Sequence, residues 1–295
     1  MALIDKFLKK TLTEQEAETP LHLLVCFSKP ETGKALCKIA NYFMQSKMKN
    51  EQIASLHLLE KEAFDKIDNI ETYKASLYEE VMHECRKGTA MIRTFVKSSD
   101  DFVSEILATS TKLKCNLVLI GIGTTVFTPQ LWGAYQKFQA YKGIPQSTDT
   151  ALDTISYKGV SSLLERNNKT TGIFIDHNLN TIDEIFIPIL DKTDIHIFDY
   201  IQRLAEKTSA KITIWDAIGI IDSIPELKKI FQVMQRNSNE RVSLWDNSKK
   251  IEYDFIKQQD LIIVGFDGWV KLISSAITWS HSLPSTLIIR KKIHT

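Results

Sequence analysis

The stretch HLLVCFSKPETGKALCKIANYFM, at His22–Met44, joins an apolar strand to a polar turn and then to an amphipathic helix. A second version, EIFIPILDKTDIHIFDYIQRL, occupies Glu184–Leu204. Each is followed, much later, by an apolar strand that runs into glycine: NLVLIGIG at Asn116–Gly123 and DLIIVGFDG at Asp260–Gly268. Solenoid repeats are about 20–50 residues long, so this period is too long for one. The repeat instead predicts two copies of one α/β domain.

Composition places the chain among ordinary globular proteins. It has 295 residues, 43% hydrophobic and 25% charged, with a formal net charge of +1. That length is a soft prior for about two domains. A net charge this close to zero gives no overall positive potential that would attract nucleic acid, so we expect no nucleic-acid partner. The four cysteines contain no CxxC spacing and read as buried free thiols in a reducing compartment: Cys26, Cys37, Cys85 and Cys115.

The ends and apolar runs of the sequence bear on its location. No apolar run approaches the ~20 residues of a membrane span. The opening segment, MALIDKFLKKTLTEQEAETP, lacks the core and cleavage site of a signal peptide. We therefore expect a soluble, cytoplasmic polypeptide.

Apolar runs alternate with helical patterns along both halves, which predicts βαβ crossovers and parallel sheets. The runs are continuous rather than alternating, as in strands covered by helices on both faces. Five strands per half predict two doubly wound, flavodoxin-like, three-layer domains. The expected strands are His22–Ser28, Ser55–Leu59, Met91–Val96, Cys115–Ile120 and Thr171–Asp176, then Glu184–Leu190, Lys211–Trp215, Arg241–Trp245, Leu261–Gly265 and Thr286–Arg290.

The expected organisation has three parts. Residues 1–19 form a linker or arm, residues 20–178 the first domain, and residues 179–295 the second. Ligands of doubly wound sheets bind beyond the carboxyl ends of the strands, where the strand order reverses. That rule brings Phe27–Gly33 toward Gly121–Thr125 in one half, and Asp191–Asp194 toward Gly265–Gly268 in the other.

With these features the sequence resembles a tandem pair of universal stress protein domains. The segment FSKPETGKAL, at Phe27–Leu36, is similar to the opening of carboxyl-terminal cytoplasmic domains in bacterial cation/proton (Na+/H+) antiporters. The opening of the second repeat is similar to the second unit of the same proteins, and the resemblance spans roughly residues 20–292. It implies a non-catalytic regulatory module at the inner face of the bacterial membrane. Residues 1–19 would then join it to a transmembrane antiporter domain.

The resemblance also implies a nucleotide site, because ATP-binding stress proteins carry G-x2-G-x9-G-[ST] after the fourth strand and an Asp after the first. Glycines of that kind let backbone N–H groups approach phosphate oxygens. In the first repeat Phe27 and Ser28 stand where the Asp would be, and Thr32 adds a nearby hydroxyl. The loop has Gly121, Gly123 and Thr124, so its second glycine is out of register. Gly159 and Ser161 would supply the distal pair after a long insertion.

The second repeat matches the nucleotide pattern differently. Asp191 fits the acidic position, and Gly265 and Gly268 fit the first half of the loop. The distal pair falls at Thr278–Trp279, where an indole would crowd a phosphate. Neither repeat holds the whole pattern, so ATP is a candidate ligand at two degenerate sites. Asp191 and Asp194 also fit a helix N-cap, where carboxylates accept backbone N–H groups, as the simpler explanation.

Other chemistry finds little support in the sequence. Gly33-Lys34 is not a P-loop, which needs glycine at position 28 and Ser or Thr at position 35, where Ser28 and Ala35 stand. The seven histidines show no metal-ligand spacing within one element. No G-x-S-x-G nucleophile motif occurs. We expect no catalytic or metal-binding residues, and therefore no enzyme.

The insertion at residues 124–157 is rich in aromatic residues. These are Phe127, Trp132, Tyr135, Phe138, Tyr141 and Tyr157. A long aromatic connection is either a helix laid over the sheet or an interface. We expect a homodimer.

The function predicted first is a regulatory, ligand-binding antiporter module. The alternative is a free-standing tandem universal stress protein that binds adenine nucleotide.

Overall fold

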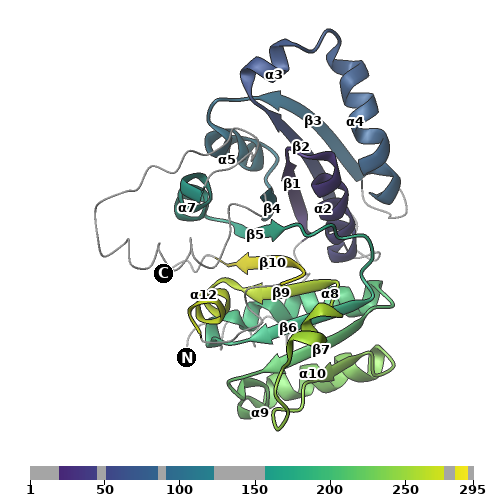
Figure 1. Ribbon diagram of the computed structural model, residues 1–295, viewed down its shortest axis with the longest axis vertical. Helices are drawn as coiled ribbons and strands as arrows, with labels where there is room; N and C mark the ends of the chain where they lie inside the picture. The colour runs from purple at the N-terminus through teal and green to yellow at the C-terminus, as the bar shows by residue number, and fades with distance from the viewer. Residues whose placement is uncertain (1–19, 45–50, 86–90, 123–156, 276–282, 292–295) are drawn as a thin grey trace, which may run out of the picture. The chain divides into compact units, whose positions relative to one another are not determined.

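The computed structural model describes residues 20–44, 51–85, 91–122, 157–275 and 283–291 (Figure 1). The chain divides into two compact units, built mainly from residues 21–178 and residues 179–289 and called here the first and the second unit. Most of the insertion at 124–157 lies outside the described residues. Among the residues described, no helix is both long enough and apolar enough to cross a bilayer.

The first unit is a parallel sheet with helices on both faces. Its strands lie in the order β3-β2-β1-β4-β5. The elements are β1 (His22–Phe27), α2 (Pro30–Phe43), β2 (Gln52–Leu59), α3 (Lys61–Asp65), α4 (Ile70–Cys85), β3 (Met91–Ser98), α5 (Phe102–Lys112), β4 (Leu117–Ile122), α7 (Tyr157–Arg166) and β5 (Thr170–Ile175). Helix α2 packs beside α4, and α5 packs beside α7 (Figure 1).

The second unit repeats this topology, with its strands in the order β8-β7-β6-β9-β10. The elements are β6 (Glu184–Ile189), the 3-10 helix η2 (Lys192–Ile197), α8 (Phe198–Lys207), β7 (Lys211–Asp216), α9 (Ile220–Ser223), α10 (Pro225–Asn237), β8 (Val242–Leu244), α11 (Tyr253–Lys257), β9 (Leu261–Gly265), α12 (Phe266–Ser274) and β10 (Ser285–Arg290). The predicted doubly wound α/β fold with parallel strands is confirmed. The order reverses between β1 and β4, and again between β6 and β9.

Local sequence explains the strand–turn–helix that opens the first unit. Strand β1 is buried along nearly its whole length, as expected of a central parallel strand. Pro30 is the first residue of α2, where no backbone N–H is needed. Leu36, Ile39 and Phe43 follow at helical spacing and are fully buried. The amphipathic helix predicted from these residues is therefore confirmed.

Several predicted boundaries are wrong, and two of them matter for the site. Gly121 lies inside β4, paired with Phe174, rather than in the loop after the strand. Gly268 lies in the first turn of α12 rather than in a glycine loop, because a helix with a buried face begins directly after β9. After β6 the chain begins its helical segment as η2 and becomes α-helical at Phe198.

Candidate functional site

The candidate site of the second unit lies at its carboxyl edge, the edge of the sheet at which the parallel strands end. Between β6 and η2 the chain makes a capping box. Asp191 is the N-cap, and its Oδ1 accepts the N–H of Thr193 at 2.9 Å. Asp194 reaches back, and its Oδ2 accepts the N–H of Asp191 at 3.2 Å. The capping role expected for the two aspartates is thus what the structure has.

Asp194 does more than cap its own turn. Its other oxygen, Oδ1, accepts the N–H of Gly268, in the first turn of α12, at 3.3 Å. A Cβ at Gly265 would overlap Oδ1, and one at Gly268 would overlap Oδ2. The two glycines that were predicted to make room for a phosphate therefore make room for the carboxyl group of Asp194, whose residue is fully buried.

Polar side chains surround this buried carboxyl. Lys271 Nζ lies 2.7 Å from Asp191 Oδ2 and donates to the carbonyl of Leu190 at 3.1 Å. The hydroxyl of Thr193 lies 2.8 Å from Asp191 Oδ1 and 2.6 Å from Asp267 Oδ2. The second unit thus holds three carboxyl groups, one hydroxyl and one ammonium at the point where its strand order reverses.

The aspartates of this cluster differ in acidity because they differ in burial. Burial raises the pKa of Asp194 to about 7, and the charges of Asp191 and Asp267 act in the same direction. The N–H groups of Gly268 and Asp191 oppose the shift but do not cancel it. Burial also acts to raise the pKa of Asp191, but hydrogen bonds from Lys271 and Thr193 outweigh it and lower that pKa. Asp194 therefore changes charge near neutral pH, whereas Asp191 stays ionised.

His196 fixes the other end of η2. Its ring is buried, with Nδ1 2.7 Å from the carbonyl oxygen of Thr193 and Nε2 3.3 Å from that of Ile289 in β10. Carbonyl oxygens only accept hydrogen bonds, so whichever ring nitrogen carries a proton donates to its carbonyl partner. The turn is therefore held at α12 by Asp194 and at β10 by His196.

The equivalent place in the first unit is filled by other side chains. A Cβ at Gly33 would lie 2.6 Å from the ring of Phe27, which takes the position expected for an acidic residue. A Cβ at Gly121 would overlap the methyl group of Thr32. The Thr32 hydroxyl donates to Asp176 Oδ2 at 3.2 Å, so it is engaged in a tie to the residue after β5.

A buried histidine lies beside Phe27. The His57 ring is 5.3 Å from the Phe27 ring, centroid to centroid, and its Nε2 lies 3.0 Å from the Tyr73 hydroxyl. Burial lowers the pKa of His57 to about 4, against a smaller opposing effect of the Phe27 backbone. His57 is therefore a neutral core residue at physiological pH, as expected for histidines outside a metal site.

The remaining predicted positions do not converge. Ser28 is half-buried directly after β1, and Gly159 and Ser161 lie on α7. Gly123 and Thr124 lie outside the described residues, as do Thr278 and Trp279. Of the predicted set, the structure brings Thr32 against Gly121, whereas Gly265 and Gly268 both lie against Asp194, three positions after Asp191.

The predicted segments Asp191–Asp194 and Gly265–Gly268 contain Thr193 and Asp267, but neither was predicted as a site residue, and Lys271 lies outside both segments. The sequence held a signal for Lys271. It lies three residues after Gly268, a spacing that puts the two residues on the same side of a helix such as α12. Within the described part of the chain, no group of three or more His, Cys, Asp or Glu side chains is arranged to hold a metal ion. The contacts within the cluster are hydrogen bonds and the ion pair of Lys271 with Asp191.

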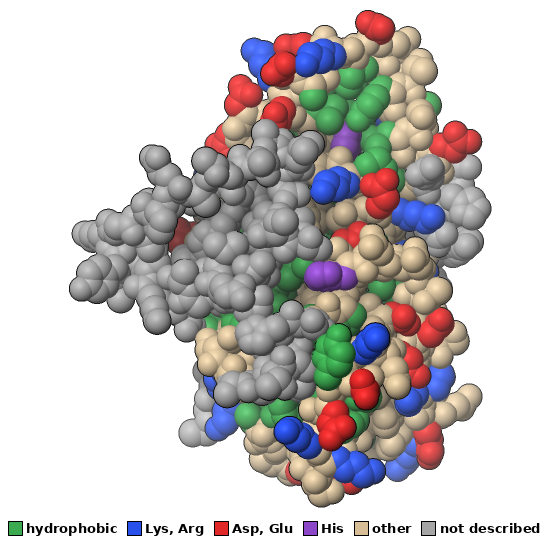
Figure 2. Space-filling model, in the orientation of Figure 1, with side chains coloured by type: hydrophobic (Ala, Val, Ile, Leu, Met, Phe, Trp, Pro, Cys, Tyr) green, Lys and Arg blue, Asp and Glu red, His purple; other side chains and the backbone are tan. Residues whose placement is uncertain are grey.

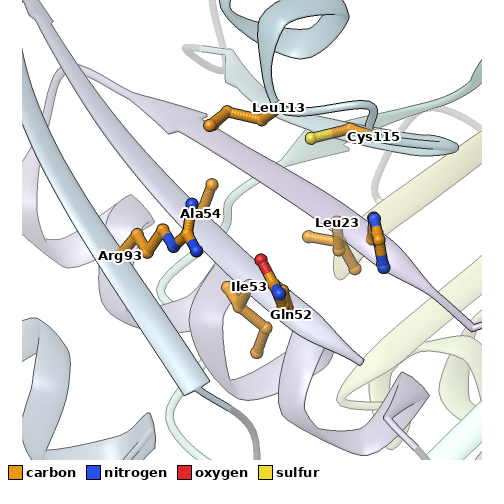
Figure 3. A pocket seen from close by; sticks show the side chains of 8 residues that line it. Leu23, Gln52, Ile53, Ala54, Arg93, Leu113 and Cys115 are labelled. Carbon is orange, nitrogen blue, oxygen red and sulfur yellow. The ribbon is translucent and has the colours of Figure 1, made fainter. Parts of the chain in front are cut away.

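A small pocket lies at the opposite, amino edge of the first unit. Its lining includes Gln52, Arg93 and Cys115 (Figure 3). Its volume of about 10 Å³ holds at most one water molecule. On the face drawn in Figure 2, acidic and basic side chains of the described residues are interspersed, with no broad patch of either sign.

No protein-family profile matches the chain, and no curated protein matches it. Solved structures with a similar fold include a universal stress protein from Archaeoglobus fulgidus DSM 4304, at 12% identity and a TM-score of 0.45, over 91% of this chain and 98% of that one. They also include a functionally unknown protein from Pseudomonas aeruginosa PAO1, at 11% identity and a TM-score of 0.46, over 92% of each chain.

Proposed function

We propose that the chain is a non-catalytic regulatory module that acts by changing its own packing, and that it serves as the cytoplasmic part of a bacterial cation/proton antiporter. One observation carries the regulatory part. The notch left by Gly265 and Gly268, where the fold would receive a ligand, is occupied by the buried carboxyl group of Asp194. An anionic ligand could use that notch only if Asp194 left it.

The first unit supports the same proposal. Gly33 is packed against Phe27, and Gly121 against Thr32. Both filling side chains belong to the strand–turn–helix that opens the unit, so each unit closes its own carboxyl edge with residues at the end of its first strand or shortly after it. Two edges closed from within suit a module that responds by rearranging, since a shift between packed states needs a difference in free energy between them.

The antiporter part of the proposal comes from FSKPETGKAL at Phe27–Leu36, whose resemblance to antiporter cytoplasmic domains includes the turn that closes the first unit. It is tested on the native protein by fractionating cells and probing with an antibody raised against residues 179–295. Recovery in the membrane fraction, on a polypeptide longer than this sequence, is the expected result. Recovery of a free 33.7 kDa chain from the supernatant contradicts it.

The alternative of a nucleotide-binding stress protein predicts a different measurement. A ligand at about 100 times its Kd adds about 2.7 kcal/mol to the free energy of unfolding, which raises the thermal midpoint. We expect no rise with millimolar ATP or ADP for the wild-type chain. A clear rise would favour the alternative. Titrating Asp194→Ala in parallel separates the two ideas further, because a rise confined to that variant means a notch that binds anions once Asp194 is removed.

A further inference from the structure

We propose that η2 is a proton-operated latch, in which the neutral carboxyl of Asp194 holds the turn in place and loss of its proton releases it. The pH-dependent opening of the turn would be the signal to which the regulatory module responds, so this role of the latch rests on the proposed function. Its test requires neither a membrane nor a nucleotide, and each idea can therefore fail without the other.

The first tie is the Asp194 carboxyl, wedged against two glycines. Its oxygens accept one backbone N–H each, from Asp191 at 3.2 Å and from Gly268 at 3.3 Å. Two long hydrogen bonds are weak compensation for a fully buried negative charge, which costs several kcal/mol to remove from water. The neutral form fits the same space without that cost, so protonation favours the closed turn.

The second tie is His196, at the other end of η2. Its ring nitrogens lie 2.7 Å from Thr193 O and 3.3 Å from Ile289 O, so it connects this end of the turn to β10. The response of the turn to protons comes from the first tie, Asp194.

The charged groups around the latch set the field in which it works. Asp267 of α12 and Asp191, the N-cap of η2, disfavour the ionised form of Asp194. Lys271 of α12 is 2.7 Å from Asp191 and offsets that charge. The titratable and charged residues on the described elements packed against η2, near this edge, are Asp191, Lys192, His196, Asp199, Asp267, Lys271 and Arg290. Neither β6 nor β9 adds a charged residue at this end.

The sign of the response follows from the two states of Asp194. In the closed turn its pKa is about 7. In an opened turn the carboxyl reaches water, and its pKa returns to about 4. Opening therefore becomes easier as the pH rises from about 4 to about 7, by up to tenfold per pH unit, and levels off above that. Acid closes the latch and neutrality releases it.

Hydrogen exchange on the full chain tests the latch. Exchange is followed in peptides covering 190–198 and 265–275 at about pH 5 and about pH 7.5, with rates corrected for the intrinsic effect of pH. We expect protection of both peptides to fall at least about tenfold between the two pH values in the wild-type chain. In Asp194→Asn, which cannot ionise, we expect a smaller fall from a lower starting protection.

A matched control comes from Asp216, a second buried carboxyl at the same edge. It accepts the N–H groups of Ile220 at 3.0 Å and Ile221 at 2.7 Å. Asp216→Asn should lower protection near α9 and leave the pH dependence of 190–198 unchanged. Equal protection of the wild-type peptides at both pH values overturns the latch, as does a fall of the same size in Asp194→Asn.

A measurement on the wild-type chain covers the case in which Asp194→Asn does not fold. The 13C shift of the Asp194 carboxyl, followed through a pH titration by NMR, reports its ionisation directly. A midpoint within about one pH unit of 7 is expected, accompanied by shift changes at the Gly268 amide. A midpoint below about pH 5 means that the closed turn accepts the charge, and the proposal is then wrong.

Discussion

The hydroxyl of Thr32 in α2 donates to Asp176 Oδ2 at 3.2 Å, across 144 positions of sequence, while the methyl group of the same residue packs against Gly121 of β4. One small side chain thus links the first helix of the first unit to its fourth strand and to the end of its fifth. Because Thr32 has two functions, its polar and apolar parts can be separated by substitution.

Thr32→Val keeps the packing against Gly121 and removes the hydrogen bond to Asp176. We expect the free energy of unfolding to fall by about 0.5–1.5 kcal/mol, the usual net contribution of one hydrogen bond. Denaturant unfolding followed by circular dichroism measures it. Asp176→Asn keeps an acceptor and should cost less. A Thr32→Val variant as stable as the wild type would mean that the hydroxyl is equally well satisfied by water.

Gly268→Ala should have opposite effects in two backgrounds. In the wild-type chain the new Cβ overlaps Asp194 Oδ2, and we expect a loss of about 1–3 kcal/mol in the free energy of unfolding. In an Asp194→Ala background the overlap is gone, and alanine in a helix is about 0.5–1 kcal/mol better than glycine. Urea unfolding of the four chains gives the coupling energy. A loss of equal size in both backgrounds would show that Asp194 does not fill the notch.

The second unit should lose stability as the solution is brought from acid to neutrality. The folded pKa of Asp194, about 7, is raised above its unfolded value, so its stabilising effect is fully present below about pH 4 and is gone above about pH 7. The measured quantity is the unfolding free energy of the wild-type chain minus that of Asp194→Asn, at several pH values in urea. We expect this difference to fall by a few kcal/mol, at most about 1.4 kcal/mol per pH unit. A difference that stays flat or rises contradicts the assignment.

His57 should act with the opposite sign in the first unit. Its folded pKa of about 4 is lowered from the ordinary value, so the unfolded chain binds the extra proton first. Its stabilising effect is therefore present above about pH 6.5 and is lost as the pH falls toward about 4. His57→Gln, which carries no titrating group, should abolish up to about 3 kcal/mol of this acid sensitivity. Tyr73→Phe serves as the control, since it removes the partner of Nε2 and leaves the ring able to titrate.

The sequence predicts the doubly wound fold because apolar strands and amphipathic helices alternate with little interruption. Pro30, at the first position of α2, marks one helix start correctly. It predicts the neighbourhood of the site as well, since the reversal of strand order must bring Asp191 toward Gly265. The boundaries near glycine are less predictable. Gly121 reads as a turn residue but is a strand residue that accommodates the Thr32 methyl group.

The occupant of the notch could not be predicted from sequence. A glycine pair such as Gly265 and Gly268 signals only that something approaches the backbone closely, and a ligand oxygen and a side-chain oxygen leave the same signal. The spacing of the glycines does not distinguish the two, because Asp194 lies 74 positions before Gly268 in the sequence. The burial that raises the pKa of Asp194 is likewise a property of the folded chain and not of the residue.

The carboxyl wedge also constrains the order in which this protein can evolve. We expect alanine at Gly268 to destabilise the chain while Asp194 is present and to stabilise it once Asp194 is replaced, which is sign epistasis between positions on separate elements. A lineage can acquire the better helix former only after surrendering the aspartate, and it cannot regain the aspartate afterwards without first restoring glycine. The packing of the Asp194 oxygens against Gly265 and Gly268 therefore makes the order of substitutions matter, and it couples changes in the turn to changes in α12.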